Sequence, residues 1–139
     1  KSRLMNHDVA SKTLKYDKIK FIVLTVMEKE PSKENEEEVS NPYQGKVFKL
    51  PYSARRRIMV GRSSAKKYTE KGLSLSKDGE VSTSHGHFRT SKGVVCFEDL
   101  DSTNGSRLNG ELLTPHKCYP LEGGHVLALG ATNMRVTFA

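Results

Sequence analysis

Residues 94–110 read Val-Val-Cys-Phe-Glu-Asp-Leu-Asp-Ser-Thr-Asn-Gly-Ser-Arg-Leu-Asn-Gly. The stretch begins with a mostly apolar segment, Val94–Glu98, which is long enough for one strand, and two Asn-Gly pairs follow it. Asn-Gly is the commonest pair where a turn needs positive φ at two successive residues. A strand followed by closely spaced turns predicts a fold of short antiparallel strands.

The same pattern of short apolar segments and turns continues on both sides of this stretch. Further turn signals are Asp78-Gly79, Lys92-Gly93 and Gly123-Gly124. The other predicted strands are Ile19–Met27, Lys46–Leu50, Arg57–Val60, Leu73–Leu75, His87–Arg89, Val126–Leu129 and Arg135–Phe138. Turns about every ten residues predict an all-β, two-sheet antiparallel β-sandwich. No amphipathic stretch is long enough for a crossover helix, which argues against a parallel α/β sheet.

The 139 residues fit one domain. Residues 1–18 are polar with little periodicity, so we expect a flexible N-terminal arm before a sandwich domain over 19–139. The strand at Ile19–Met27 is apolar throughout, which predicts burial on both of its faces. Residues 31–42 carry four glutamates between two prolines and predict a mobile acidic loop.

The composition narrows the classes of partner. The formal net charge of +7 favours nucleic acid, anionic lipid or phosphorylated protein. No apolar run approaches the roughly 18 residues that span a bilayer, so we expect no membrane insertion. Cys96 and Cys118 form no C-x-x-C pair, which argues against zinc or a disulfide and places Cys96 in the core. We therefore expect reduced thiols in an intracellular protein, with no cofactor and no metal.

Three polar motifs lie in or beside the predicted connections. Gly61-Arg62 ends one strand, Ser82-Thr83-Ser84-His85 lies in another connection, and Ser102-Thr103-Asn104-Gly105 follows the 94–98 strand. Each motif alone is ordinary: an arginine at a strand end is usually solvated, Ser-x-x-His is common by chance, and Ser-Thr-Asn-Gly is a usual turn.

Taken together and in this order, the motifs are specific. From about residue 19 to residue 138 the chain resembles the forkhead-associated (FHA) domain family. Members of that family carry Gly-Arg, Ser-x-x-His, Ser-Thr-Asn-Gly, Asn-Gly, and a Gly-rich turn with a closing Leu-Gly. The last two elements are here Asn109-Gly110 and the segment 121–130. The resemblance implies an FHA-type sandwich without enzymatic activity, whose loops bind phosphothreonine on partner proteins. It also implies a nuclear or cytoplasmic location.

The residue chemistry agrees with this implication. A phosphothreonine carries about −1.5 to −2 charges and three strong acceptor oxygens. Arg62 offers planar, charge-assisted donors, and Ser82, Thr83 and Thr103 offer hydroxyls on loops. We therefore predict that these four residues bind the phosphate.

The resemblance also implies roles for the neighbouring residues. Asn104 resembles the family residue that hydrogen-bonds the ligand backbone beside the phosphothreonine. His85 resembles the structural histidine that braces the loop of Ser82, and we expect it to be partly buried and to make no ligand contact. The remaining structural residues, expected to serve backbone geometry and turns, are Gly61, Gly105, Asn109 and Gly110.

Two positions depart from the family pattern. Thr83 stands where relatives often carry a larger polar or basic side chain, so a second charged contact to the phosphate is lost. His125 replaces the usual aspartate of the late Gly-Asp turn, which leaves a turn that could respond to pH.

Three further residues form a candidate rim. Lys66 and Lys67, in the loop after Arg62, either extend the basic surface or are solvated loop charges. Arg55–Arg57 has the same ambiguity. Glu80 precedes Ser82 by two residues and, if it lines the peptide site, disfavours an acidic residue after the phosphothreonine and favours a basic or apolar one.

Rival functions find less support. None of the nucleophile-elbow, zinc-protease, Walker or dinucleotide motifs is present. Ser82, His85 and Glu80 have the residue types of a catalytic triad, but nothing in the sequence predicts a nucleophile elbow or an oxyanion hole. The aromatic residues do not alternate with Lys or Arg as a nucleic-acid stacking platform would. A third alternative keeps the fold as a scaffold or dimerisation module, for example through phosphorylated Thr13. We favour a monomeric domain.

Overall fold

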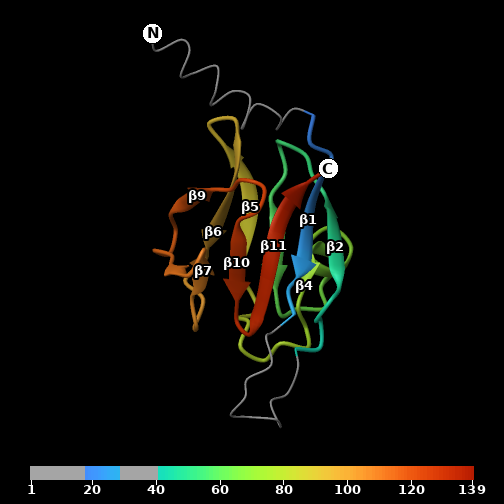
Figure 1. Cartoon of the computed structure of the whole chain (residues 1–139), viewed down its shortest axis with the longest axis vertical. Helices are drawn as coiled ribbons and strands as arrows, with labels where there is room; N and C mark the ends of the chain where they lie inside the picture. The colour runs from blue at the N-terminus through green and yellow to red at the C-terminus, as the bar shows by residue number, and fades with distance from the viewer. Residues whose placement is uncertain (1–17, 29–40) are drawn as a thin grey trace.

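The computed structural model describes residues 18–28 and 41–139, which form two sheets packed face to face (Figure 1). The first, sheet A, has the strand order β2-β1-β11-β10-β7-β8, and the second, sheet B, has the order β4-β3-β5-β6-β9. The strands are β1 (Phe21–Val26), β2 (Val47–Pro51), β3 (Ile58–Gly61), β4 (Leu73–Ser74), β5 (Gly86–Ser91), β6 (Val94–Asp99), β7 (Ser106–Leu108), β8 (Glu111–Leu112), β9 (Cys118–Pro120), β10 (Val126–Leu129) and β11 (Thr132–Phe138). The predicted two-sheet sandwich is confirmed.

The core lies between the two sheets and is built by alternating residues of each strand. β1 buries Ile22, Leu24 and Val26, whereas the residues between them are half-buried. The prediction that this strand is buried on both faces was wrong, because no second layer of described residues covers the outer side of sheet A. In sheet B, Phe88 and Phe97 lie opposite each other and pack edge to face with ring centroids 5.2 Å apart. Both rings are fully buried in the core.

Among the described residues, three strands and one helix were missed by the sequence analysis. β7, β8 and β9 are only two or three residues long, too short for an alternation of polar and apolar residues to be visible. The segment after Arg62, predicted as a loop, contains the one-turn helix α2 (Lys66–Thr69). The sheets are also not wholly antiparallel, since the short strand β4 pairs with β3 in parallel.

The predicted turns are confirmed where two adjacent strands pair directly. Lys92 and Gly93 have φ of 52° and 79° between β5 and β6, and Asn109 and Gly110 have φ of 52° and 87° between β7 and β8. Two successive positive φ values are what a two-residue hairpin turn requires. Asn104-Gly105 differs, because only Gly105 has positive φ and the pair joins strands of different sheets.

The predictions for the N-terminal region and the acidic loop concern residues that the structure does not describe. The arm, including Thr13 and apart from Lys18, lies outside the described residues. The acidic loop does so as well, apart from Asn41 and Pro42.

Candidate functional site

The polar motifs gather at one end of the sandwich. Arg62 directly follows β3, Ser82 and Thr83 lie in the β4–β5 connection, and Thr103 and Asn104 lie in the β6–β7 connection. The β4–β5 connection meets the β10–β11 turn at the end of the sandwich that lies away from the C-terminus (Figure 1). Connections far apart in the sequence therefore share one surface.

Hydrogen bonds hold the backbone and Nε of Arg62, whereas its two terminal nitrogens can bind a ligand. Its backbone N–H donates to the carbonyl of Ser82 at 2.9 Å, and its side-chain Nε–H donates to the carbonyl of Val81 at 2.9 Å. The side chain is exposed, and no hydrogen bond to a described residue engages its two terminal nitrogens. A guanidinium held in this way presents its planar fork of donors outward.

Ser82 and Thr103 are in direct contact although they come from different connections. The backbone N–H of Thr103 donates to Ser82 Oγ at 2.9 Å. Because this oxygen accepts that bond, the Ser82 hydroxyl hydrogen is left to donate elsewhere. We call Arg62, Ser82 and Thr103 the loop-end cradle. Thr83 is exposed beside it, and no described residue hydrogen-bonds its side chain.

Asn104 and Glu80 lie side by side next to this cradle. Asn104 Nδ2 donates to the backbone carbonyl of Glu80 at 2.9 Å, and both side chains are exposed. The amide of Asn104 thus keeps its oxygen and one N–H for a ligand.

His85 is completely buried rather than partly buried as predicted. Its Nδ1 accepts from the backbone N–H of Ser82 at 3.0 Å, and its Nε2 lies 3.1 Å from the carbonyl of Gly105. A carbonyl only accepts, so Nε2 carries the proton and Nδ1 does not. Burial lowers the pKa of His85, and the carboxylate of Asp99 opposes that shift. The neutral ring thus joins the β4–β5 and β6–β7 connections.

Asp99 is a buried carboxylate that the sequence analysis missed. Its two oxygens accept from the hydroxyl and backbone N–H of Ser102, at 2.6 and 3.0 Å, and from the hydroxyl of Ser106 at 2.5 Å. The signal in the sequence is its spacing, because Val95, Phe97 and Asp99 alternate on the core side of β6. An acid on that side needs such partners.

Asp78 is a second missed carboxylate, noticed only as part of a turn. One of its oxygens accepts from the backbone N–H of Glu80 at 3.0 Å. The other accepts from the N–H of Ala131 at 2.9 Å and the hydroxyl of Thr132 at 2.6 Å. Asp78 therefore attaches the β4–β5 connection to the β10–β11 turn.

Helix α2 supports the cradle through Tyr68. This residue is buried, and its hydroxyl lies 3.0 Å from Ser84 Oγ in the β4–β5 connection. The Lys66 and Lys67 side chains are exposed on the same helix and make no hydrogen bond or ion pair with a described residue. The structure therefore places both lysines on a helical turn rather than in a loop, and their role as a rim stays a prediction.

Gly61 is where the strand end comes closest to the β4–β5 connection. A Cβ atom at this position would lie 2.1 Å from the carbonyl oxygen of Thr83 and 2.9 Å from the ring of Tyr68. The introduction of any side chain there forces one of the two segments away.

Farther along the chain, His125 Nδ1 accepts from the N–H of Glu122 within the late turn.

Two properties of the described part of the chain bear on other kinds of site. Within residues 18–28 and 41–139, no group of three or more His, Cys, Asp or Glu residues is arranged to hold a metal ion. No helix found among these residues is long and apolar enough to cross a membrane.

Comparison with known proteins adds the family. No curated protein matches the sequence. An FHA domain of an Arabidopsis thaliana hypothetical protein is 25% identical, with a TM-score of 0.64 and coverage of 92% of this chain and 90% of that chain. An FHA domain from Chlamydia trachomatis is 23% identical, with a TM-score of 0.56 over 84% and 96% of the two chains.

A third similar structure is the FHA domain of MEK1 in complex with a phosphothreonine peptide of HOP1. It is 21% identical, with a TM-score of 0.55 over 84% of this chain and 95% of that chain. The family model for the FHA domain matches residues 58–130, which is more than half of the chain and includes all three motifs. This chain belongs to the FHA domain family.

Proposed function

We propose that this protein is a phosphothreonine-dependent protein-binding module that docks phosphorylated partners at its loop end. One observation carries the proposal. Arg62, Ser82 and Thr103 come from three separate connections, and hydrogen bonds of 2.9 Å link their segments into one group at the surface. The FHA domain is a family of interaction modules, and its recognition of phosphorylated motifs through arginine is a general mode.

The donors left over in the loop-end cradle match a phosphate in charge and number. The terminal nitrogens of Arg62 supply a charge-assisted pair of donors, which suits two phosphate oxygens. The hydroxyls of Ser82 and Thr103 supply single donors for the remaining oxygen. A doubly charged phosphate gains more from these donors than a neutral threonine, so binding depends on phosphorylation.

Asn104 gives the site a means of holding the ligand backbone. Its free amide oxygen and second N–H match the N–H and C=O of one residue of an extended peptide. Since its other N–H is engaged by the Glu80 carbonyl, the amide plane is fixed before the ligand arrives. Fixing the amide in advance lowers the entropic cost of binding.

The arginine assignment is tested by Arg62→Ala. Titration calorimetry with the best peptide from an oriented phosphothreonine library should give a micromolar Kd for the parent, which corresponds to roughly −8 kcal/mol. Removal of the guanidinium should cost about 2 to 5 kcal/mol, because a desolvated phosphate loses its charge partner.

Controls separate this loss from a general effect of charge. Arg135→Ala removes an exposed guanidinium on the far strand β11 and should leave Kd within about twofold. Phosphoserine and unphosphorylated peptides should bind more weakly. If Arg62→Ala binds as well as the parent, the domain is a phosphate-independent scaffold and the proposal fails.

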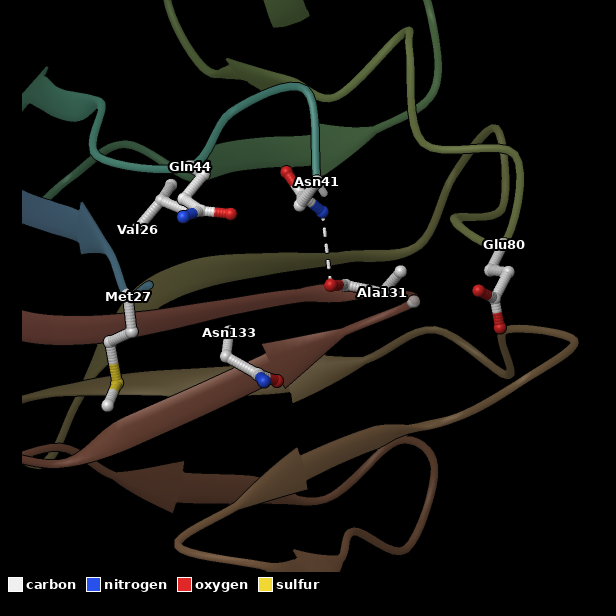
Figure 2. Close-up of a pocket in the computed structure, with 8 residues that line it drawn as sticks. Val26, Met27, Asn41, Gln44, Glu80, Ala131 and Asn133 are labelled. Carbon is white, nitrogen blue, oxygen red and sulfur yellow. Dashed lines mark hydrogen bonds between the residues drawn. The ribbon is translucent and has the colours of Figure 1, made fainter. Parts of the chain in front are cut away.

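We further propose that Glu80 influences which residues are accepted after the phosphothreonine. Its side chain lines one side of a pocket whose other walls include the amides of Asn41, Gln44 and Asn133 (Figure 2). A single carboxylate among neutral amides attracts a basic side chain and repels an acidic one.

A phosphothreonine library with varied residues after the phosphothreonine tests this preference. The parent should select Lys or Arg over Asp or Glu, and Glu80→Gln should reduce that selection about threefold while it keeps the dependence on phosphate. An acidic preference in the parent would reject the role of Glu80 and leave that of Arg62 intact.

A further inference from the structure

The outward side of sheet A differs from an ordinary solvated sheet face. Its residues, which we call the outer face of sheet A, are Phe21, Val23, Thr25, Val47, Lys49, Pro51, Arg107, Leu112, Val126, Ala128, Asn133, Arg135 and Thr137. They alternate with residues that point into the core. A solvated face of an antiparallel sheet normally carries mainly polar side chains. Here more than half of the residues are apolar, and Val47 and Leu112 are 59% and 60% exposed.

All charges on this face are positive. Lys49, Arg107 and Arg135 are exposed, and none of the residues that make up the face is acidic. Each arginine donates one Nη1 hydrogen bond to a backbone carbonyl, Arg107 to Gly110 at 3.3 Å and Arg135 to Gly124 at 3.0 Å. These bonds restrain the guanidinium groups and leave other N–H donors for a partner.

The three cations lie on every second strand of the sheet. Lys49 is on β2, Arg135 on β11 and Arg107 on β7, and these strands can be followed side by side in Figure 1. The register shifts each cation by two residues from the previous one. Two strand spacings and a two-residue shift separate successive cations by roughly 12 Å.

Mostly apolar residues fill the intervals between the cations. The line from Lys49 to Arg135 crosses β1 between Val23 and Thr25, and the line from Arg135 to Arg107 crosses β10 between Val126 and Ala128. The face thus alternates charge, apolar patch, charge, apolar patch and charge along one diagonal.

An amphipathic helix has the matching repeat. Seven or eight residues of α-helix span roughly 10.5 to 12 Å and return to the same side of the helix. Acidic residues at that spacing meet the three cations, and apolar residues midway between them meet the patches. From this geometry we infer that the outer face of sheet A docks an acidic amphipathic helix of a partner protein, at a site separate from the loop-end cradle.

Other occupants fit less well. A second copy of the same face would bring cations against cations, which is unfavourable. A partner strand would pair poorly with the edge strand β2, because Pro51 has no N–H to donate and its carbonyl already accepts from Arg56 at 2.7 Å. A lipid surface favours protruding aromatic side chains, whereas the ring of Phe21 is half-buried beneath the Lys49 ammonium, which lies 4.4 Å from the ring centroid.

The test uses a synthetic helical peptide of about 20 residues with glutamates seven residues apart and leucines midway between them. Titrated into ¹⁵N-labelled protein, it should shift the backbone amide signals of β1, β10 and β11. The double variant Lys49→Glu/Arg135→Glu should weaken binding at least tenfold. The variant Lys66→Glu/Lys67→Glu changes the net charge equally on α2 and should weaken it less than twofold.

Several results would overturn the inference. These are equal binding of a peptide with glutamine in place of glutamate, equal weakening by the α2 variant, or signal shifts confined to the loop end. Sedimentation that shows a dimer lost in the Arg135→Glu variant would identify a second copy as the occupant instead. Arg107→Glu provides an independent variant if the double one is unfolded. Arg62→Ala should leave binding of this peptide unchanged, so the outcome is independent of the loop-end cradle.

Discussion

His85 and His87 are separated by one glycine, and each lies near a carboxylate of β6, yet the two clusters connect different parts of the molecule. The loop cluster consists of His85, Asp99, Ser102 and Ser106. The strand cluster consists of His87, Arg89, Glu98 and Cys118.

The loop cluster joins segments that no strand ladder holds together. His85 links the backbone N–H of Ser82 to the carbonyl of Gly105, and Asp99 holds the hydroxyls of Ser102 and Ser106. His85, Asp99 and Ser106 are at most 1% exposed. The polar groups of these three residues therefore depend on their partners, since water cannot replace them.

The strand cluster joins β5 to β6 and β9, which the backbone ladder already pairs. Glu98 Oε1 accepts from Arg89 Nε at 3.0 Å and lies 3.2 Å from His87 Nε2. Burial raises the pKa of the Cys118 thiol to about 11, so it stays protonated and donates to the same oxygen at 3.5 Å. The Glu98 and Arg89 side chains are 13% and 34% exposed. The contrast teaches that a pair of a histidine and a carboxylate contributes most to the structure where backbone hydrogen bonds do not already hold the same two segments together.

Of the variants that follow, Asp99→Ala should reduce both the free energy of unfolding and the affinity for the phosphopeptide the most. It leaves the buried Ser106 hydroxyl without a partner and removes two hydrogen bonds to a charged group, which costs about 3 to 5 kcal/mol of unfolding free energy. Urea denaturation measures that loss. Phosphopeptide affinity should fall more than tenfold, because Thr103 follows directly on the released turn.

Glu98→Ala is the matched control on the neighbouring residue of the same strand. It should cost only about 1 kcal/mol, since solvent reaches the pair and the ladder remains. Its phosphopeptide Kd should stay within about twofold of the parent. If the two variants reduce affinity equally, the distinction between the clusters is wrong. Asp99→Asn keeps the shape of the side chain and serves as the test if Asp99→Ala does not fold.

Gly61→Ala tests the loop end through packing instead of charge. The added methyl group meets the Thr83 carbonyl at 2.1 Å, so the β4–β5 connection must move, at a cost of about 2 kcal/mol. Affinity for the phosphopeptide should fall with it, because Arg62 and Ser82 are displaced relative to each other. Thermal unfolding and calorimetry measure the two effects.

Gly79→Ala is the control in the same connection. Nothing lies within 4 Å of a Cβ atom at Gly79, and its φ is not in the positive region. Its stability should change by less than about 0.5 kcal/mol. A loss as large as that of Gly61→Ala would show that the β4–β5 connection is generally intolerant of change, and that the contact with Thr83 is not the cause.

The features that the sequence predicted well are those set by residues close together in the chain. The turn at Lys92-Gly93 was predicted because positive φ at two successive residues is a local demand that few pairs satisfy. The positions of Arg62, Ser82 and Thr103 were predicted because loop motifs keep their order in the chain, and the structure brings their segments together. Their binding roles stay predictions.

What the sequence could not supply depends on register and on contacts between distant segments. The spacing of Asp99 indicates that it points inward, but its contacts with Ser102 and Ser106 require the turn between β6 and β7 to be placed. Tyr68 was missed because its contact with Ser84 requires both helix α2 and the β4–β5 connection to be placed. The alternation of charged and apolar residues on the outer face of sheet A appears only after six strands are placed in order.

Acidification should reveal the smallest difference between the clusters. Burial lowers the pKa of both His85 and His87 from 6.5 in the folded protein. Below about pH 6.5 the unfolded chain therefore binds more protons than the folded protein. As the pH is lowered, the free energy of unfolding decreases by up to about 1.4 kcal/mol per pH unit for each such histidine. Urea midpoints at pH 7.5 and 5.5, without peptide, should show this loss.

The location of the loss separates the two histidines. A proton on His85 Nδ1 removes the acceptor of the Ser82 N–H, so the amide signal of Ser82 should shift and exchange faster on acidification. His87→Gln removes the other histidine and should leave that local response in place. If the Ser82 signal stays constant while stability falls, the strand cluster carries the pH dependence, and the neutral ring of His85 is not what holds the loop.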